Sequence, residues 1–258
     1  MSDILQVILL GVIEGVTEFL PISSTGHLLI AEHWLGARSE LFNVAIQAGA
    51  ILAVVFIYWQ RLWQLTLGFR QPQHRDYLLK LGAAFLITAV GGFVAKKLGL
   101  KLPETVLPVA LALVIGGIVI LLIERRPENQ AKAPLTWSVA IWVGLAQILA
   151  AVFPGTSRSA ATIFAAMLAG QSRVAATEFA FLVGIPTMFA ASGYEFLKLT
   201  KDGGLAREDW SALATGFVVS ALVAFVVVKW LLRYIQTHKF TAFAWYRIAL
   251  GAALLALA

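Results

Sequence analysis

Long hydrophobic stretches alternate with short polar segments along the whole chain. Six of these stretches approach the roughly 20 residues that a helix needs to cross a bilayer. They are residues 41–59, 78–94, 107–123, 178–197, 211–232 and 242–257. They lack the alternation of a strand, and an open sheet cannot satisfy its backbone in lipid, so we expect helices. The polar segments between them, including 60–76, are expected to be loops.

Two further apolar stretches, 4–20 and 137–153, are each interrupted by a polar turn. The turns lie at 21–27 and 154–159, and the apolar pattern then resumes to about 35 and 170. Each half is too short to span the bilayer comfortably. Each turn carries a proline, which ends one helix, and hydroxyl residues, which cap the next. The pattern predicts two re-entrant helix-turn-helix hairpins whose tips lie at membrane depth.

The second half of the chain resembles the first at an offset of 133 residues. This offset places Gly11 on Gly144, Glu14 on Gln147, Pro21 on Pro154, Ser23 on Thr156 and Ser24 on Ser157. Each half would hold one hairpin and three spans, and an odd number of spans inverts the second half. The sequence therefore predicts a single all-α integral membrane domain over 1–258, with an inverted-topology repeat. Repeat 1 covers about 1–126 and repeat 2 about 134–258, giving about six transmembrane helices plus the two hairpins.

Composition agrees with this interpretation and excludes several classes. The chain is 60% hydrophobic and only 13% charged, and it has no cysteine. A soluble enzyme, a disordered chain and a disulfide-stapled secreted domain are excluded. The net charge of +6 is not gathered in a basic run, so we expect no nucleic-acid partner.

The distribution of basic residues predicts the orientation. One side of the predicted topology receives eleven: Arg61, Arg70, Arg75, Lys80, Arg125, Arg126, Lys132, Arg173, Lys229, Arg233 and Lys239. The other side receives seven: Arg38, Lys96, Lys97, Lys101, Lys198, Lys201 and Arg207. The side with eleven is expected to be cytoplasmic, which puts both termini outside. The first hairpin then enters from outside and the second from the cytoplasm, so the two tips can meet.

Ionisable residues inside apolar segments are costly, and here they concentrate in the hairpins. Glu14 and Glu18 are four residues apart, on one face of the first half-helix. They precede the Ser23-Ser24-Thr25-Gly26 turn and His27. The alternative is that both carboxyls are hydrogen-bonded to hydroxyls and purely structural. Their position beside the turn favours an active site.

Both turns are suited to binding an anion. Ser23 or Ser24 can cap the first new helix, and Thr156 or Ser157 the second, so that free N–H groups point toward the tips. Arg158 adds a cation that can bind phosphate in bidentate fashion. The arrangement indicates a phosphate or pyrophosphate site, with carboxylate as the competing ligand. The candidate phosphate-binding residues are Ser23, Thr25, Gly26, Ser157, Ser159, Thr162 and Gln47.

A polyanion beside Glu14 and Glu18 needs compensation. Either one carboxyl is protonated or a divalent cation bridges carboxylate and phosphate oxygens. We expect the cation, Mg²⁺ or Ca²⁺, because the ligands would be hard oxygens. Glu178, Glu195 and Arg247 also lie in or at the ends of spans, where an internal ion pair and a role in the site are both open.

The two turns resemble the signature motifs of a known family. The motifs are Glu14-Gly-Val-Thr-Glu18-Phe-Leu-Pro-Ile-Ser-Ser-Thr-Gly-His27 and Pro154-Gly-Thr-Ser-Arg-Ser-Ala-Ala-Thr162. They are similar to those of the undecaprenyl-pyrophosphate phosphatase, or bacitracin-resistance, family. The resemblance runs over essentially the whole chain, including Tyr246-Arg247. It implies a bacterial cytoplasmic membrane enzyme that removes the terminal phosphate of undecaprenyl pyrophosphate and recycles this lipid carrier for cell-wall synthesis. It also implies a site that opens to the periplasmic or external face.

The resemblance and the chemistry together assign catalytic roles. We expect Ser24 to be the nucleophile, with His27 as a nearby base or acid. Glu18 would orient or deprotonate, Glu14 and Glu18 would hold the metal, and Arg158 would stabilise the phosphoryl group. His27 as nucleophile and direct attack by water remain alternatives. The rival function is a lipid-phosphate transporter or flippase that uses the same inverted-repeat site. The oligomeric state, a homodimer included, is open.

Overall fold

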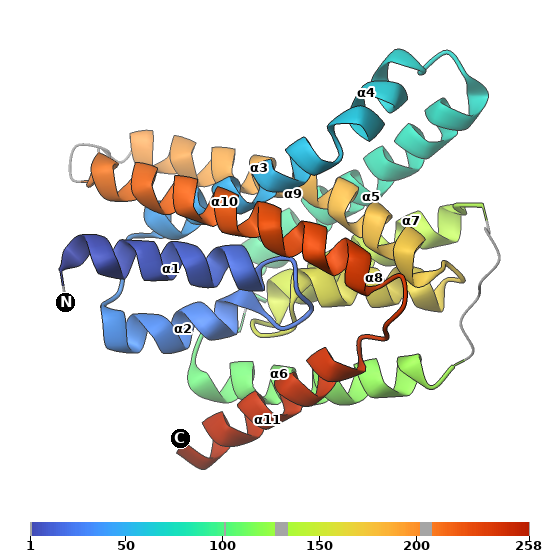
Figure 1. The fold of residues 1–258 in the computed structure, drawn as a ribbon. Helices are drawn as coiled ribbons and strands as arrows, with labels where there is room; N and C mark the ends of the chain where they lie inside the picture. The colour runs from blue at the N-terminus through green and yellow to red at the C-terminus, as the bar shows by residue number, and fades with distance from the viewer. Residues whose placement is uncertain (1, 101, 127–133, 202–207, 258) are drawn as a thin grey trace.

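The computed structural model describes residues 2–100, 102–126, 134–201 and 208–257. Within these ranges all regular structure is helical (Figure 1). The helices are α1 (Asp3–Thr17), α2 (Ser24–Leu35), α3 (Glu40–Ile57), α4 (Trp59–Leu67), α5 (Pro72–Lys97), α6 (Val106–Glu124), α7 (Trp137–Val152), α8 (Arg158–Leu168), α9 (Arg173–Lys201), α10 (Trp210–Tyr234) and α11 (Thr241–Leu257). The all-α prediction is confirmed.

In the described part of the chain, five helices are long and apolar enough to cross a membrane, namely α3, α5, α6, α9 and α10. The sixth predicted span corresponds to α11, an apolar helix of 17 residues. Large apolar side chains such as Leu86, Ile115 and Val226 are about 60% exposed on the outer faces of these helices. Such surfaces would be unfavourable in water. The chain is therefore a multi-pass membrane protein.

The segment 60–76 is not the loop that its polar residues suggest. It contains most of α4 and the start of α5, which begins at Pro72. Helix α4 is amphipathic, because Leu65 is fully buried while Trp59 and Trp63 are exposed. Polar residues on one face of a short helix look like a loop when only the apolar runs are counted.

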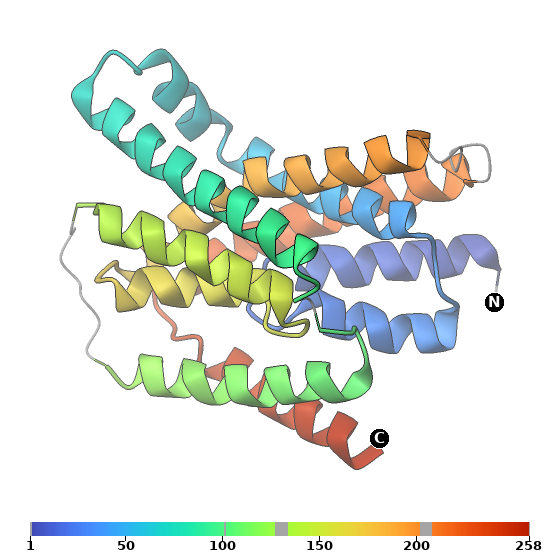
Figure 2. The ribbon, with the colours of Figure 1, turned by 180° about the vertical axis from the view of Figure 1, so that it is seen from behind.

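The two predicted hairpins are present and enter the molecule from opposite ends (Figures 1 and 2). Helices α1 and α2 pack against each other at the end where both termini lie, and α7 packs against α8 at the other end. Their turns meet near the centre of the molecule. The predicted meeting of the two tips is therefore observed.

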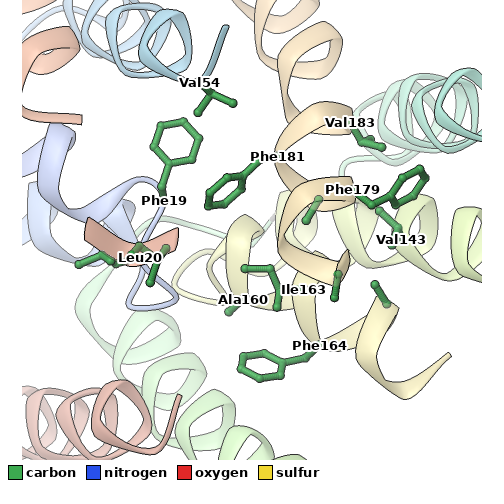
Figure 3. Packing of buried hydrophobic residues seen from close by; sticks show 14 of the residues in the cluster. Phe19, Leu20, Val54, Val143, Ala160, Ile163, Phe164, Phe179, Phe181 and Val183 are labelled. Carbon is green, nitrogen blue, oxygen red and sulfur yellow. The ribbon is translucent and has the colours of Figure 1, made fainter. Parts of the chain in front are cut away.

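A hydrophobic core surrounds the meeting point and holds the tips in place (Figure 3). Phe19, which lies just after the end of α1, packs edge-on against Phe181 of α9, with the ring centroids 5.1 Å apart. Ile163 of α8 and Phe179 of α9 are fully buried in the same cluster. Burial of each such side chain contributes about 1.5–3 kcal/mol. The core therefore fixes both hairpins against α9.

Close helix crossings complete the scaffold. Gly49 of α3 lies so near α10 that an added Cβ would fall 2.3 Å from the carbonyl oxygen of Phe217. Gly15 of α1 faces the carbonyl of Ser220 in the same way, at 2.7 Å. Small residues at such crossings are usual where membrane helices pack closely. They bring α1, α3 and α10 together on one side of the hairpin tips.

Two basic residues counted toward the topology are buried structural groups. Arg173 forms a bidentate pair with Glu124, through Nη2 to Oε2 at 2.8 Å and Nε to Oε1 at 3.2 Å. Lys80 is also buried and donates to the carbonyl oxygen of Leu135 at 2.6 Å. Three other residues of the count, Lys101, Lys132 and Arg207, lie outside the described residues.

Candidate active site

The turn of each hairpin is closed by a serine in an unusual backbone conformation. Ser23 caps α2 with φ of 74°, and its Oγ accepts a hydrogen bond from the Gly26 amide at 3.3 Å. Ser157 caps α8 with φ of 69° and accepts from the Ala160 amide at the same distance. Non-glycine residues rarely adopt this left-handed region, and it is common at functional sites. Of the two candidate caps in each turn, the structure selects Ser23 and Ser157, which lie 134 residues apart.

Glu18 joins the two hairpins. Its Oε2 accepts a hydrogen bond of 2.6 Å from the Ser24 hydroxyl, and its Oε1 accepts one of 2.9 Å from Arg158 Nη2. Glu18 and Ser24 come from the first hairpin and Arg158 from the second. Both carboxylate oxygens are used, so the contact orients the hydroxyl and the guanidinium at once.

Glu14 lies deeper than Glu18 and is completely buried. Neither of its carboxylate oxygens has a hydrogen-bond partner among the described residues. Its charged neighbours are Glu18 and Arg158. A buried carboxyl without partners is costly, and such a group is a reason to look for a bound proton, water or cation.

A cavity of about 510 Å³ lies over this contact. Seven candidate residues line it: Glu18, Ser23, Ser24, Thr25, Gln47, Ser157 and Arg158. Another cavity, of about 500 Å³, lies between α3, α9 and α10 and is lined mainly by apolar and small side chains. Because the candidate residues converge on the first cavity, we take the first as the candidate active site.

Several candidate residues make structural contacts outside the cavity lining. Ser159 donates to the Leu20 carbonyl at 3.0 Å, which ties the second tip to the first hairpin. Thr162 donates to the carbonyl of Arg158 at 2.8 Å, and Gly26 packs against α6. Ser159, Thr162 and Gly26 therefore brace the tips and do not line the cavity where a phosphate would lie.

The sequence led us to expect His27 beside the Ser24 hydroxyl, but the two side chains are not paired in the structure. Its Nδ1 lies 2.7 Å from the Ser23 carbonyl oxygen, and its Nε2 lies 2.6 Å from the Tyr246 hydroxyl. The expected pairing of Ser24 with His27 places both on one helical face. The structure instead turns the imidazole toward α11, and the hydroxyl bonds to Glu18.

Comparison with known proteins identifies the family. The family model described as bacitracin resistance protein BacA matches residues 7–253. The chain belongs to this family. It is 65% identical over 258 residues to the undecaprenyl-diphosphatase of Rhizobium etli, covering 99% of this chain and 97% of the relative. It is 64% identical over 260 residues to that of Stenotrophomonas maltophilia and 59% identical over 260 residues to that of Xanthomonas euvesicatoria, with the same coverage. The resemblance of the two motifs is thereby confirmed.

Arg247 organises both turns. It is fully buried in α11, and its guanidinium donates to five main-chain carbonyl oxygens at 3.0–3.4 Å. One belongs to Pro21 in the first turn, two to Gly155 and Thr156 in the second, and two to α6. The sequence identified Arg247 as a charged residue inside an apolar span, but it could not predict which carbonyl oxygens the guanidinium would bond to. For Glu178 and Glu195, ion pairs with Arg61 and Lys96 are observed.

Two residues that sequence reasoning did not assign to the site lie in the cavity. Gln147 Nε2 donates to Thr88 Oγ1 at 2.8 Å, and both side chains line the wall. The carbonyl oxygen of the Gln147 side chain has no partner among the described residues. The signal in the sequence was the offset that places Gln147 opposite Glu14. Only the contact between α5 and α7 brings Thr88 to it.

The cavity extends toward the end of the molecule that carries both termini. Its lining at that end includes Lys96, Glu104 and Glu195, from the last turns of α5 and α9 and the segment before α6. Lys96 Nζ lies 3.4 Å from Glu195 Oε1 and is 59% exposed. The charged residues therefore mark the mouth, and the hairpin tips mark the interior.

Proposed function

We propose that this chain is an undecaprenyl-diphosphatase that hydrolyses undecaprenyl pyrophosphate to the monophosphate and inorganic phosphate. This activity recycles the lipid carrier for peptidoglycan synthesis and confers bacitracin resistance. The observation that carries the proposal is the Glu18 carboxylate, which is bonded to a hydroxyl of its own hairpin and to Arg158 of the other. It joins a nucleophile and a phosphate-binding cation in one cavity.

The reaction follows from these contacts. Ser24 Oγ attacks the terminal phosphorus and passes its proton to Glu18 Oε2, 2.6 Å away. The bond from this phosphorus to the bridging oxygen breaks, and Glu18 gives the proton to the departing lipid monophosphate. Water, deprotonated by Glu18, then cleaves the phosphoserine. Ser24 recovers a proton, and hydrogen phosphate leaves.

Arg158 supplies the charge that phosphoryl transfer requires. Its Nη2 is held by Glu18, and its buried Nη1 has no hydrogen-bond partner in the described part of the chain. We assign the Arg158 guanidinium, which lines the cavity, to the transferring phosphoryl group. The first-turn N–H groups of α2 and α8 assist at the two tips.

Phosphate release in detergent tests the activity. Wild-type protein is expected to release inorganic phosphate from undecaprenyl pyrophosphate, and Ser24→Ala to release none, because the nucleophile is gone. Ser192→Ala, a serine of the apolar cavity, is the matched control. Acid quenching with substrate labelled in the terminal phosphate should trap label on wild type and not on Ser24→Ala. Label on His27, or none under any quench, would contradict the assignment of Ser24.

The same assay separates hydrolysis from transport. A flippase needs groups that bind a lipid phosphate, whereas a hydroxyl bonded to a carboxylate is a nucleophile paired with its base. No gradient exists in detergent, so release of phosphate there is evidence for an enzyme. Binding of substrate without release would favour the transporter.

We propose a divalent cation, Mg²⁺ or Ca²⁺, held by Glu14 and Glu18. The unpartnered oxygens of Glu14 fit such an ion, although the described residues contain no cluster of three acidic or histidine side chains. Mg²⁺ commonly takes one or two carboxylates and completes its shell with water and phosphate oxygens. When bound, it would offset charge on the pyrophosphate. Chelation should abolish activity and added metal restore it; full activity after chelation would contradict this proposal.

We further propose that the chain is an inverted-topology repeat in the bacterial cytoplasmic membrane, with its active site open to the periplasmic or external face. Support comes from the opposite entry of the hairpins, the two left-handed serine caps and the cavity mouth at the end with both termini. Lys97→Cys should react with an impermeant maleimide on intact spheroplasts. Arg125→Cys, exposed at the other end, should react only after permeabilisation. The reverse labelling pattern would refute this orientation.

A further inference from the structure

A chain of two hydrogen bonds runs from α11 to the residue that precedes the proposed nucleophile. The Tyr246 hydroxyl lies 2.6 Å from His27 Nε2, and His27 Nδ1 lies 2.7 Å from the carbonyl oxygen of Ser23. The two rings are nearly parallel, with an interplanar angle of 7°. We call this arrangement the Tyr246–His27 bridge.

The partners determine which ring nitrogen carries the proton. A carbonyl oxygen only accepts, so His27 Nδ1 must be protonated to bond to Ser23. In the neutral ring Nε2 then has the lone pair, and the Tyr246 hydroxyl donates to it. Both nitrogens are therefore engaged outside the cavity, and neither is available to Ser24.

The bridge adds a shorter hydrogen bond to a long main-chain bond at the strained cap. Ser23, with φ of 74°, accepts its helical bond from the His27 amide at a long 3.4 Å, while the imidazole lies at 2.7 Å. The second hairpin provides a comparison. Ser157, with φ of 69°, accepts from the Ala161 amide at 2.9 Å, and Ala161 has no side chain that could donate. Of these two caps, only the one beside the proposed nucleophile has a side-chain donor on its carbonyl oxygen among the described residues.

We propose that Tyr246 and His27 are positioning residues for Ser24. Tyr246 holds the tautomer and orientation of His27, and His27 holds the Ser23 carbonyl, so that the left-handed cap presents Ser24 to Glu18 and to the phosphorus. The inference rests on the proposed phosphatase activity, but its structural part can be tested without it. Neither residue is assigned a proton transfer in the reaction.

Substitutions at His27 separate positioning from acid–base chemistry. Asparagine places an amide N–H near the position of Nδ1, so it can still donate to Ser23, but it cannot act as a base. We expect His27→Asn to keep kcat within about threefold of wild type, and His27→Ala to lose about tenfold in kcat with little change in KM. Equal losses in the two variants, with unchanged melting temperatures, would overturn the proposal.

A double-mutant cycle tests whether Tyr246 acts through His27. Tyr246→Phe should lower kcat by about fivefold in the wild-type background, since one hydrogen bond is lost. In the His27→Asn background it should have no effect, because asparagine does not reach the hydroxyl. Tyr234→Phe, an aromatic hydroxyl on α10 that bonds to the Lys239 carbonyl, is the matched control and should be neutral. The same loss in both backgrounds would refute the coupling.

Nitrogen NMR of histidine-labelled protein provides a readout independent of activity. The chain has four histidines, and the His27 signals are those missing from His27→Asn. We expect a protonated Nδ1 in wild type; an unprotonated Nδ1 would overturn the bridge even in an active enzyme. Absence of phosphate release from wild type would instead refute the proposed function and leave this measurement intact.

Discussion

Gly184 of α9 leaves the space that the Arg158 guanidinium occupies. A Cβ added at Gly184 would fall 2.4 Å from Arg158 Nη1 and 3.4 Å from its Cζ. The obstructing atom is the end of a flexible side chain and not backbone, so we expect the guanidinium to move and the helices to stay. Gly184→Ala therefore displaces Arg158 without changing it.

The magnitude follows from the contact that is lost. Arg158 Nη2 bonds to Glu18 Oε1 at 2.9 Å in a largely buried pair. A hydrogen bond to a charged group contributes about 1.5–3 kcal/mol, which corresponds to about 10- to 150-fold in rate if the transition state loses it. The free energy of unfolding should rise even though the rate falls, because alanine is favoured over glycine inside a helix by about 0.5–1 kcal/mol.

The assay is phosphate release from undecaprenyl pyrophosphate in detergent, together with the melting temperature. Gly193→Ala is the control, because it lies on the same helix and an added Cβ there meets nothing within 4 Å. We expect Gly193→Ala to keep full activity and Gly184→Ala to lose at least about tenfold in kcat/KM at an unreduced melting temperature. Wild-type activity in Gly184→Ala would refute the role given to the Arg158 position.

Three further substitutions test the base, the brace of the turns and the scaffold. Glu18→Gln keeps a hydrogen-bond acceptor but cannot take the Ser24 proton, so kcat should fall about 100-fold or more; a smaller loss, measured as phosphate release, would exclude Glu18 as the base. Arg247→Lys leaves three donors for five carbonyl groups and should lower both the melting temperature in detergent and the activity; an unchanged melting temperature would contradict the role of Arg247. Arg173→Met leaves the buried Glu124 carboxylate without its cationic partner, although the Phe240 amide still donates to it, and should cost about 3–5 kcal/mol of stability, of which Glu124→Leu in the same chain should recover a part. A double variant no more stable than Arg173→Met would show that the ion pair is not the cause.

Local features of the chain were predictable because their causes are local. Long apolar runs form helices in lipid whatever surrounds them, and a proline followed by hydroxyl residues ends one helix and starts another. The two hairpins and five of the six spans follow from this. Helix α4 was missed because its apolar residues occupy one face only. The polar residues between them make the segment look like a loop when only continuous apolar stretches are sought.

The candidate site was predictable as a set of residues but not as a set of contacts. Buried ionisable groups are rare in membrane segments, so Glu14, Glu18 and Arg158 could be singled out from the sequence. Which hydroxyl each carboxyl meets depends on side-chain direction at the turns. His27 is an example. Its spacing along the helix predicted a pairing with Ser24, whereas in the structure the imidazole bonds to Tyr246 of α11.

By itself, the sequence determined that this is a helical membrane protein of the BacA family with two helix-turn-helix hairpins, because hydropathy and the motifs are properties of neighbouring residues. Only the tertiary structure decided that Glu18 joins Ser24 to Arg158, that Arg247 bonds to both turns and that His27 faces Tyr246. These partners lie 91 to 226 residues apart for Arg247 and 219 apart for His27. Contacts over such separations depend on how the helices pack, and packing depends on the shapes of all the helices together.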